Sequence, residues 1–265
     1  MLTIGIAGLG AVGAPVARRL AEGVPGLVLG AIAVRDPAKV AAALPGVAVR
    51  IVDFDELAFT CDVVVEALPR ALFRAVAVPA IERGRVLVAL TAGAFLDEED
   101  LIVRARTTGA RIIIPSGALL GLDAVRAASE GTIRSATIET RKPPAGLLGA
   151  PYLERNGISL DDVREPLLVF SGSAREGARG FPANVNVAAA LSLAGIGPDR
   201  TRLDIWADPN VTRNTHRVTV DADSTRFTMQ IEGVPSEENP RTGKLTPLST
   251  IATLRGLVDS LRVGT

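Results

Sequence analysis

The chain contains few of the residues that build metal centres and disulfide frameworks. Its 265 residues include one cysteine, one histidine, one tryptophan and one tyrosine, and aromatic residues make up only 3%. A single cysteine excludes an internal disulfide and a cysteine-rich zinc site, and such scarcity is typical of a reducing compartment. We therefore expect no metal site, and we interpret Cys61 as a small buried hydrophobe.

An excess of charge of one sign is also absent. The 29 basic residues balance 29 acidic residues, and no run of lysine and arginine marks a surface for nucleic acid or an anionic membrane. No apolar stretch approaches the ~20 residues of a membrane span, and the N-terminus lacks the basic region of a signal peptide. We expect a cytoplasmic protein that binds a small molecule, with neither nucleic acid nor a membrane as partner.

Three glycines follow the first apolar run of the chain. Residues 2–7 have the apolar density of a buried strand, and apolar residues recur at helical spacing after the glycines. Gly8 permits a tight turn, Gly10 lets backbone N–H groups approach a phosphate, and Gly13 lets the helix pack closely on the strand. A glycine turn in some other α/β protein is the alternative. The context favours a dinucleotide site formed by Gly8, Leu9, Gly10, Ala11, Val12 and Gly13.

The same alternation of strand and helix continues to residue 114. Further apolar β runs span residues 27–34, 47–52, 62–68, 85–90 and 110–114, with helix-like segments at 37–43, 71–82 and 97–108. Six strands with intervening helices predict a Rossmann-type doubly wound parallel sheet. We interpret Asp97 as the N-cap of the helix expected at 97–108 and Asp100 as an acidic residue of its first turn.

From residue 115 the pattern changes to alternating strands with fewer helices. The expected strands span residues 135–140, 167–171, 201–207, 215–220 and 226–232, and a small-residue helix spans 183–194. We predict a second α/β domain with an open, mostly antiparallel sheet and no parallel crossovers. The dinucleotide-binding domain then covers residues 1–114, completed by a C-terminal helix within 243–265, and the substrate and dimerisation domain covers 115–242.

The residues after the second strand bear on which nicotinamide cofactor is used. Val34 stands where an NAD-binding fold usually has an acid, whereas Arg35 is suited to a ribose 2′-phosphate. This favours NADP, or dual use of NADP and NAD. In the alternative interpretation, Asp36 accepts hydrogen bonds from the ribose or caps the next helix.

Loops at the carboxyl ends of the fourth and fifth strands are the expected source of further cofactor contacts, because open sheets bind ligands at that edge. The loop residues are Leu68, Pro69, Thr91, Ala92 and Gly93. Plain turns at both places are the alternative.

Five segments of the second half carry a resemblance to a known family. They are PSGALLGLDA (115–124), TRKPP (140–144), FPANVNVAA (181–189), ADPNVTRNTH (207–216) and PSEENP (235–240). In this order they resemble the L-aspartate dehydrogenase family over nearly the whole chain. The pairing of FPxNVNVAA with a downstream Asn-x-His is far more specific than the glycine motif.

The resemblance implies NAD(P)-dependent interconversion of L-aspartate with iminosuccinate, or with oxaloacetate plus ammonia. It also implies a homodimer and, in some organisms, a place in NAD biosynthesis. Matched residue by residue, it places the active-site histidine at His216, a cofactor-contacting asparagine at Asn186 and a cofactor contact through the backbone of Ala118. Amine oxidation needs an acid/base group near neutrality, and an imidazole supplies one.

A dicarboxylate substrate needs cationic or N–H partners in a partly dry pocket. Lys142, one of only three lysines, is the preferred cation and Arg141 the second, with a surface pair at a strand end as the alternative. We interpret Asn184 as a helix cap. Weaker substrate-binding candidates are Ser116, Ser173 and Ser236, since loop serines commonly close local turns.

Two other functions remain open at this point. A dehydrogenase or imine reductase of the same family acting on another small amino acid would carry the same motifs. A non-catalytic dinucleotide sensor would keep the fold, but it has little need for an acid/base group such as His216.

Overall fold

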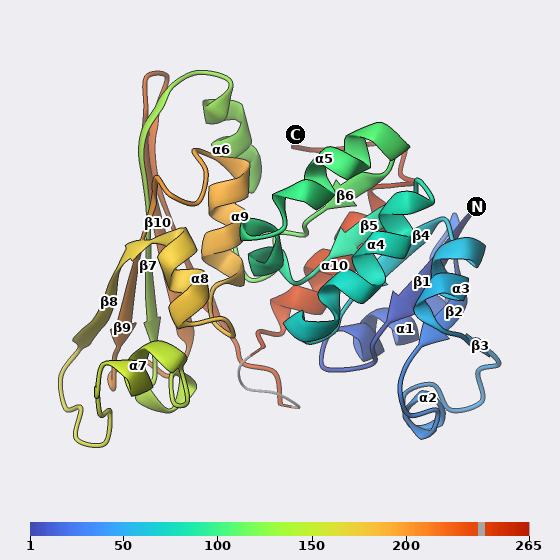
Figure 1. Ribbon diagram of the computed structural model, residues 1–265, viewed down its shortest axis with the longest axis horizontal. Coiled ribbons are helices and arrows are strands. Elements are labelled where there is room, and N and C mark those ends of the chain that lie inside the picture. The colour runs from blue at the N-terminus through green and yellow to red at the C-terminus, as the bar shows by residue number, and fades with distance from the viewer. Residues whose placement is uncertain (238–241, 265) are drawn as a thin grey trace. The chain divides into compact units, whose positions relative to one another are not determined.

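The computed structural model describes residues 1–237 and 242–264, and these form two compact units (Figure 1). Unit 1 comprises Met1–Gly117 and Thr246–Arg262, and unit 2 is built from Ala118–Leu245. Each unit folds around its own sheet. Within the described ranges, no helix has both the length and the apolar character needed to cross a membrane.

Unit 1 contains a six-stranded sheet in which every neighbouring pair of strands is parallel. The strands are β1 (Leu2–Ala7), β2 (Leu27–Ala33), β3 (Arg50–Ile51), β4 (Val63–Glu66), β5 (Val86–Ala89) and β6 (Arg111–Ile113). Their order is β3-β2-β1-β4-β5-β6. The chain therefore moves outward from β1 in one direction and returns to begin the other half at β4, as expected for a doubly wound Rossmann-type sheet.

The helices of unit 1 alternate with its strands along the chain (Figure 1). They are α1 (Gly13–Ala21), α2 (Ala38–Ala43), α3 (Phe54–Thr60), α4 (Phe73–Glu82) and α5 (Glu99–Thr108), with short 3₁₀ turns η1 (Arg70–Leu72) and η2 (Ala92–Leu96). The sheet is buried between them, and all four residues of β4 are inaccessible to solvent. Cys61 is buried and free, as expected.

The C-terminal helix α10 (Leu245–Arg255) packs on the core of unit 1. Leu254 is 1% exposed and belongs to the same buried cluster as Ile4 and Val16. Burying one leucine side chain contributes about 2 to 3 kcal/mol to the stability of a fold. Residues of the C-terminal helix α10 therefore help to stabilise the core of unit 1.

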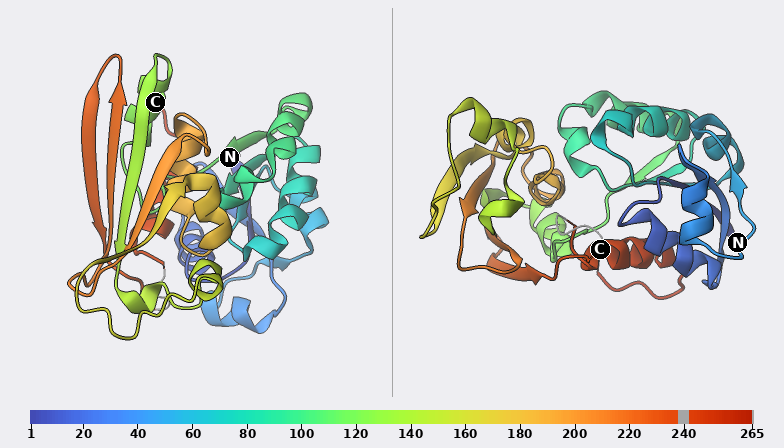
Figure 2. Two further views of the ribbon diagram at one scale, coloured as in Figure 1. Left: turned by 60° about the vertical axis from the view of Figure 1, so that its left-hand side comes forward. Right: turned by 90° about the horizontal axis from the view of Figure 1, so that it is seen from below.

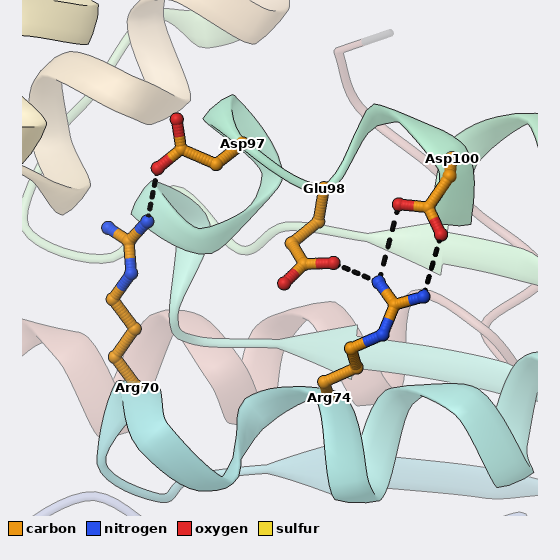
Figure 3. Close-up of polar contacts among 5 residues, drawn as sticks. All are labelled: Arg70, Arg74, Asp97, Glu98 and Asp100. Carbon is orange, nitrogen blue, oxygen red and sulfur yellow. Dashed lines mark hydrogen bonds and ion pairs between the residues drawn. The ribbon is translucent and has the colours of Figure 1, made fainter.

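Two local expectations in unit 1 were wrong. The third strand is reduced from residues 47–52 to Arg50–Ile51, because it pairs with β2 over only two positions. Glu98, and not Asp97, occupies the N-cap of α5, where it makes no side-chain capping bond. Asp97 instead accepts a hydrogen bond from Arg70 at 2.6 Å (Figure 3).

Unit 2 contains a five-stranded mixed sheet in the order β11-β10-β7-β9-β8. Its strands are β7 (Ile133–Lys142), β8 (Leu167–Ser173), β9 (Thr201–Ala207), β10 (Asn214–Ala222) and β11 (Arg226–Gly233). Three neighbouring pairs are antiparallel, as expected, but β7 and β9 are parallel. The expectation of no parallel crossover was wrong, because the long segment between β7 and β9 contains helices and lets the chain return in the same direction.

Helices lie on one face of this sheet (Figure 2). They are α6 (Leu122–Ser129), α8 (Ala174–Gly180) and α9 (Asn186–Ala194), while the short α7 (Pro151–Arg155) and the turn η3 (Pro144–Gly146) follow β7. Side chains alternate along β7 accordingly: Ile138, Thr140 and Lys142 are buried, and Glu139 and Arg141 face the other way. This alternation decides which polar residues of unit 2 share a face.

Candidate active site

The glycine loop of unit 1 is shaped by close backbone packing at its first and third glycines. Gly8 has a φ of 96°, and a Cβ there would lie 2.5 Å from the carbonyl oxygen of Ala67. A Cβ on Gly13 would lie 1.9 Å from the carbonyl oxygen of Gly8. Both positions therefore require glycine, whereas Gly10 has no atom within 4 Å of the place its Cβ would take.

The start of α1 is a candidate anion site, although the N–H of Ala14 already bonds to the carbonyl of Gly10 and Pro15 has no N–H. Val12 occupies the N-cap and provides no side-chain acceptor, and the first turn, which is fully described, contains no acidic residue. A helix N-terminus of this kind favours a phosphate, through its N–H groups and its partial positive charge. Together with the open space beside Gly10, these features fit the pyrophosphate of a dinucleotide. Leu9 and Ala11 are half-buried beside them.

The three residues that follow β2, Val34, Arg35 and Asp36, have different surroundings. The Asp36 carboxylate accepts a hydrogen bond from the backbone N–H of Ala38 at 3.0 Å, at the start of α2. Arg35 is exposed, and its guanidinium has no hydrogen-bond or ion-pair partner among the residues that the structure describes. Val34 is half-buried against the core cluster. Arg35 is thus the free charged group at this edge, and Asp36 is engaged in starting a helix.

The predicted cofactor loops after β4 and β5 lie beside each other, because their strands are neighbours. Leu68 is half-buried and Pro69 exposed, whereas Ala92 and Gly93 are buried in η2. Thr91 reaches across to β4, where its hydroxyl donates to Glu66 Oε1 at 2.9 Å.

Glu66 was not among the site residues predicted from the sequence. The signal was present, since a lone carboxylate ends the apolar run VVVE. The structure buries that carboxylate completely.

Unit 2 places His216 on the buried face of its sheet. His216 of β10 lies opposite Thr140 of β7, and its Nδ1 is 3.0 Å from the Thr140 hydroxyl. His216 is only 4% exposed to solvent. If Nδ1–H donates to Thr140, the Nε2 lone pair is left to accept a proton.

Burial sets the protonation of His216. Desolvation by burial and, second, the positive charge of Lys142 together lower the pKa of the imidazole to about 3. The imidazole is therefore neutral at physiological pH. In this state it can accept a proton, provided that the entering substrate raises its pKa.

Lys142 lies on the same face as His216 and is 5% exposed. Its Nζ donates a hydrogen bond of 2.6 Å to Asn184 Oδ1. The expectation that Asn184 caps a helix was wrong: Val185 is the N-cap of α9, and the Asn184 side chain points to the lysine instead. A buried ammonium beside a neutral imidazole is an arrangement suited to an anion.

Arg141 occupies the opposite face of the sheet. Its guanidinium pairs with Glu139 at 2.8 Å and with Asp208 at 3.0 Å, and it stacks 4.7 Å from the ring centre of Trp206. These contacts commit its charge away from His216. Of the two basic residues in TRKPP, the structure therefore brings only Lys142 to the histidine.

The remaining predicted residues are spread over both units. The Ser173 hydroxyl is used in a capping box with Glu176 at the start of α8. Ser116 and Ala118 are half-buried in the loop before α6, and Asn186 is the exposed first residue of α9. Ser236 is half-buried, and its backbone N–H bonds to Thr242. Residues 238–240 of the PSEENP motif lie outside the described residues.

No group of histidine, cysteine and acidic residues in the described ranges has the arrangement of a metal site.

Two family models match the chain. One, described as the NAD-binding domain of homoserine dehydrogenase, matches residues 8–115. The other, described as the C-terminal domain of aspartate dehydrogenase, matches residues 123–257, which is half of the chain. The chain belongs to the aspartate dehydrogenase family. The resemblance drawn from the motifs of the second half is thereby confirmed.

Curated relatives of this family match over the full length of the chain. An L-aspartate dehydrogenase of Bradyrhizobium diazoefficiens is 54% identical, with 100% of this chain and 94% of the relative covered. L-aspartate dehydrogenase 3 of Bordetella bronchiseptica is 48% identical, with 100% and 98% covered. Both family domains are thus present in this chain.

Solved structures support the fold. The crystal structure of aspartate dehydrogenase from Thermotoga maritima has a TM-score of 0.75 at 24% identity, with both chains covered completely. A scyllo-inositol dehydrogenase from Lactobacillus casei, at 15% identity and a TM-score of 0.53, covers 98% of this chain and 88% of its own. The likeness at these identities concerns the architecture alone.

The depressed pKa of His216 predicts a pH dependence of stability. The folded pKa of about 3 lies below the unfolded value near 6.5, so the stabilising contribution is present above pH 6.5 and is lost as the pH falls toward 3. Between pH 7 and pH 5 the wild type should lose about 2 kcal/mol more unfolding free energy than His216→Asn. Urea denaturation at both pH values measures the difference. Equal losses in the two proteins would contradict the assignment.

Proposed function

We propose that this chain is an NAD(P)-dependent L-aspartate dehydrogenase. It would oxidise L-aspartate to iminosuccinate, which hydrolyses to oxaloacetate and ammonia, or run the reaction in reverse. The observation that carries the proposal is the pairing of a neutral imidazole with a buried ammonium on one sheet face, in a member of this family. That arrangement suits an anionic substrate whose amine must lose a proton.

The dinucleotide would be held by unit 1. The loop from Gly8 to Gly13 and the start of α1 would bind the pyrophosphate, and Arg35 would bind the 2′-phosphate of NADP. Asp36 would be the ribose acceptor if NAD is used, so NAD use stays part of the proposal. The bound nicotinamide accepts or donates the hydride. By the resemblance, Ala118 and Asn186 also contact the cofactor.

Lys142 would bind a carboxylate of the substrate. Its ammonium is desolvated and already directed by Asn184, so its attraction for a carboxylate is stronger than that of a solvated lysine. The two carboxylates of an entering substrate would also oppose the effect of the Lys142 charge on His216. Negative charge beside an imidazole raises its pKa, which brings the group toward the working pH. Substrate binding thereby converts a weak base into an effective one.

His216 would move the proton of the reacting amine. The substrate amine must be neutral before hydride leaves Cα, so in oxidation Nε2 accepts one proton from the ammonium group. In the direction of amination the same nitrogen returns a proton to the newly formed amine. Thr140 would hold the ring through Nδ1, which fixes the direction in which Nε2 points. Ser116 and Ser236 remain weaker candidates for hydroxyl contacts to the carboxylates.

Two further properties come from the resemblance: a homodimer and a place in NAD biosynthesis. A family dehydrogenase acting on another small amino acid is the alternative. It would share the cofactor site and His216, and it would differ in how the substrate side chain is bound.

The reaction can be followed by cofactor oxidation. We expect NADH or NADPH to be oxidised when oxaloacetate and ammonium are both present, because the ammonium supplies the amine of the imine. Pyruvate, 2-oxoglutarate and glyoxylate serve as comparison substrates in the same spectrophotometric assay. An absence of oxaloacetate-dependent oxidation would sink the proposal, and a preference for another oxoacid would favour the alternative.

His216→Ala should lower turnover by ~10²-fold or more, since this is the usual size of an acid/base contribution. The affinity for NADH and NADPH, measured by fluorescence titration, should be nearly unchanged. Thr219→Ala is the matched control, because Thr219 lies on the same strand with its hydroxyl 3.4 Å from that of Thr228. Full activity of His216→Ala would transfer the acid/base role to another residue.

Arg35→Ala should weaken NADPH binding about tenfold, because a charged contact to the 2′-phosphate is worth about 1.4 kcal/mol or more. NADH lacks that phosphate, so its dissociation constant should change less than twofold. Arg19→Ala controls for the loss of one exposed positive charge, since Arg19 pairs with Glu22 on the outer surface of α1. An equal effect of Arg35→Ala on both cofactors would remove the phosphate assignment.

A further inference from the structure

Glu66 is the one fully buried carboxylate among the described residues of unit 1. It ends β4, the strand beside β1, where the order of the sheet changes direction. In an open α/β sheet, ligands bind at the carboxyl ends of the strands near such a point. The carboxylate thus lies beneath the edge at which the dinucleotide is proposed to bind, although no step of the reaction uses it.

The closest hydrogen bonds to the Glu66 carboxylate come from two residues of the predicted cofactor loops, Leu68 and Thr91. Oε1 accepts a hydrogen bond from the backbone N–H of Leu68 at 2.9 Å and another from the Thr91 hydroxyl, also at 2.9 Å. Oε2 accepts from the backbone N–H of Thr91 at 3.0 Å. One side chain therefore joins the loop after β4 to the loop after β5.

The glycine loop is packed onto the same group. Gly8 approaches the carbonyl of Ala67 so closely that no Cβ can be accommodated there, and Ala67 directly follows Glu66. The backbone of Gly8 also receives support from β2, through its N–H bond to Ala33. The three loops that would contact one cofactor are therefore held close to one another around the end of β4.

Burying a carboxylate is unfavourable unless its oxygens are hydrogen-bonded. Burial raises the pKa of Glu66, while its bonds to Leu68 and Thr91 act in the opposite direction. An apolar side chain would fill the same volume without that desolvation cost, but it would leave two loop N–H groups without an acceptor. The buried carboxylate is therefore explained by the backbone N–H groups of Leu68 and Thr91 that it holds in place.

We propose that Glu66 is a positioning residue for the nicotinamide half of the cofactor, acting through the loops at Leu68 and Thr91. This inference rests on the proposed cofactor-binding function. The pyrophosphate and adenosine half would be bound by the glycine loop and by the residues after β2. The two halves of the cofactor should therefore depend on Glu66 to different extents.

The variant Glu66→Gln tests the proposal with little change in volume. An amide has one acceptor oxygen, so one of the loop N–H groups then faces an NH₂ group and loses its bond. The fold should persist, because Phe73 and Phe95 pack edge to face at 5.0 Å and Arg70 binds Asp97 across the same two loops (Figure 3). Arg74 adds contacts to Glu98 and Asp100.

Two ligands separate positioning from general damage. Fluorescence titration should show the dissociation constant of NADH or NADPH raised about tenfold in Glu66→Gln. Calorimetric titration with ADP-ribose, or with its 2′-phosphate where NADPH is preferred, should show less than a twofold change, because these probes lack nicotinamide. Arg104→Gln, which breaks an exposed ion pair with Glu82, should change neither value.

The outcomes are distinct. If the wild type binds neither NADH nor NADPH, the proposed function itself fails. If the wild type binds cofactor and Glu66→Gln weakens both ligands equally, or neither, Glu66 has no positioning role. If Glu66→Gln does not fold, Thr91→Val removes the hydroxyl contacts to Glu66 and to the carbonyl of Leu68 and keeps the backbone N–H bond. It should weaken the whole cofactor about threefold while sparing ADP-ribose, and unchanged cofactor binding would overturn the proposal.

Discussion

Desolvation of ionisable groups at strand ends is the constraint on which the site of unit 2 depends. Lys142 and His216 share the helix-covered face of the sheet, where water cannot stabilise either charge. Desolvation and the nearby positive charge of Lys142 both disfavour protonation of the imidazole, so its pKa falls to about 3 and the ring stays neutral. The site of unit 2 therefore combines one basic side chain, Lys142, with one neutral proton acceptor, His216.

The same constraint operates in unit 1 with the opposite sign. Glu66 is buried at the end of β4, where the sheet stops and loop N–H groups need acceptors. The carboxylate satisfies them, and the desolvation cost is offset because each of its oxygens is bonded. In both units a buried ionisable group therefore occurs at or near a strand end, in contact with the residues that are proposed to hold a ligand.

How much of this could be predicted from the sequence depended on the range of each interaction. The glycine loop and most strands of unit 1 carry local patterns along the chain, so periodicity and spacing predicted them, apart from the extent of β3. Asn184 is different: its partner Lys142 lies 42 residues away, and only the folded sheet brings them together. The parallel pairing of β7 with β9 was missed for the same reason. Arg141 and Lys142 are adjacent in TRKPP, yet strand alternation sends them to opposite faces.

The charge balance of the site has a consequence for substrate choice. In the free protein, the ammonium of Lys142 has a neutral hydrogen-bond partner in Asn184, and it depresses the pKa of His216. In the proposed site, one substrate carboxylate would neutralise the lysine and leave little negative charge to attract a proton onto the imidazole. A second carboxylate would offset the positive charge of the substrate's own ammonium, and so would raise the imidazole pKa further. A dicarboxylic amino acid would therefore promote the deprotonation of its own amine more than a monocarboxylic amino acid of similar size.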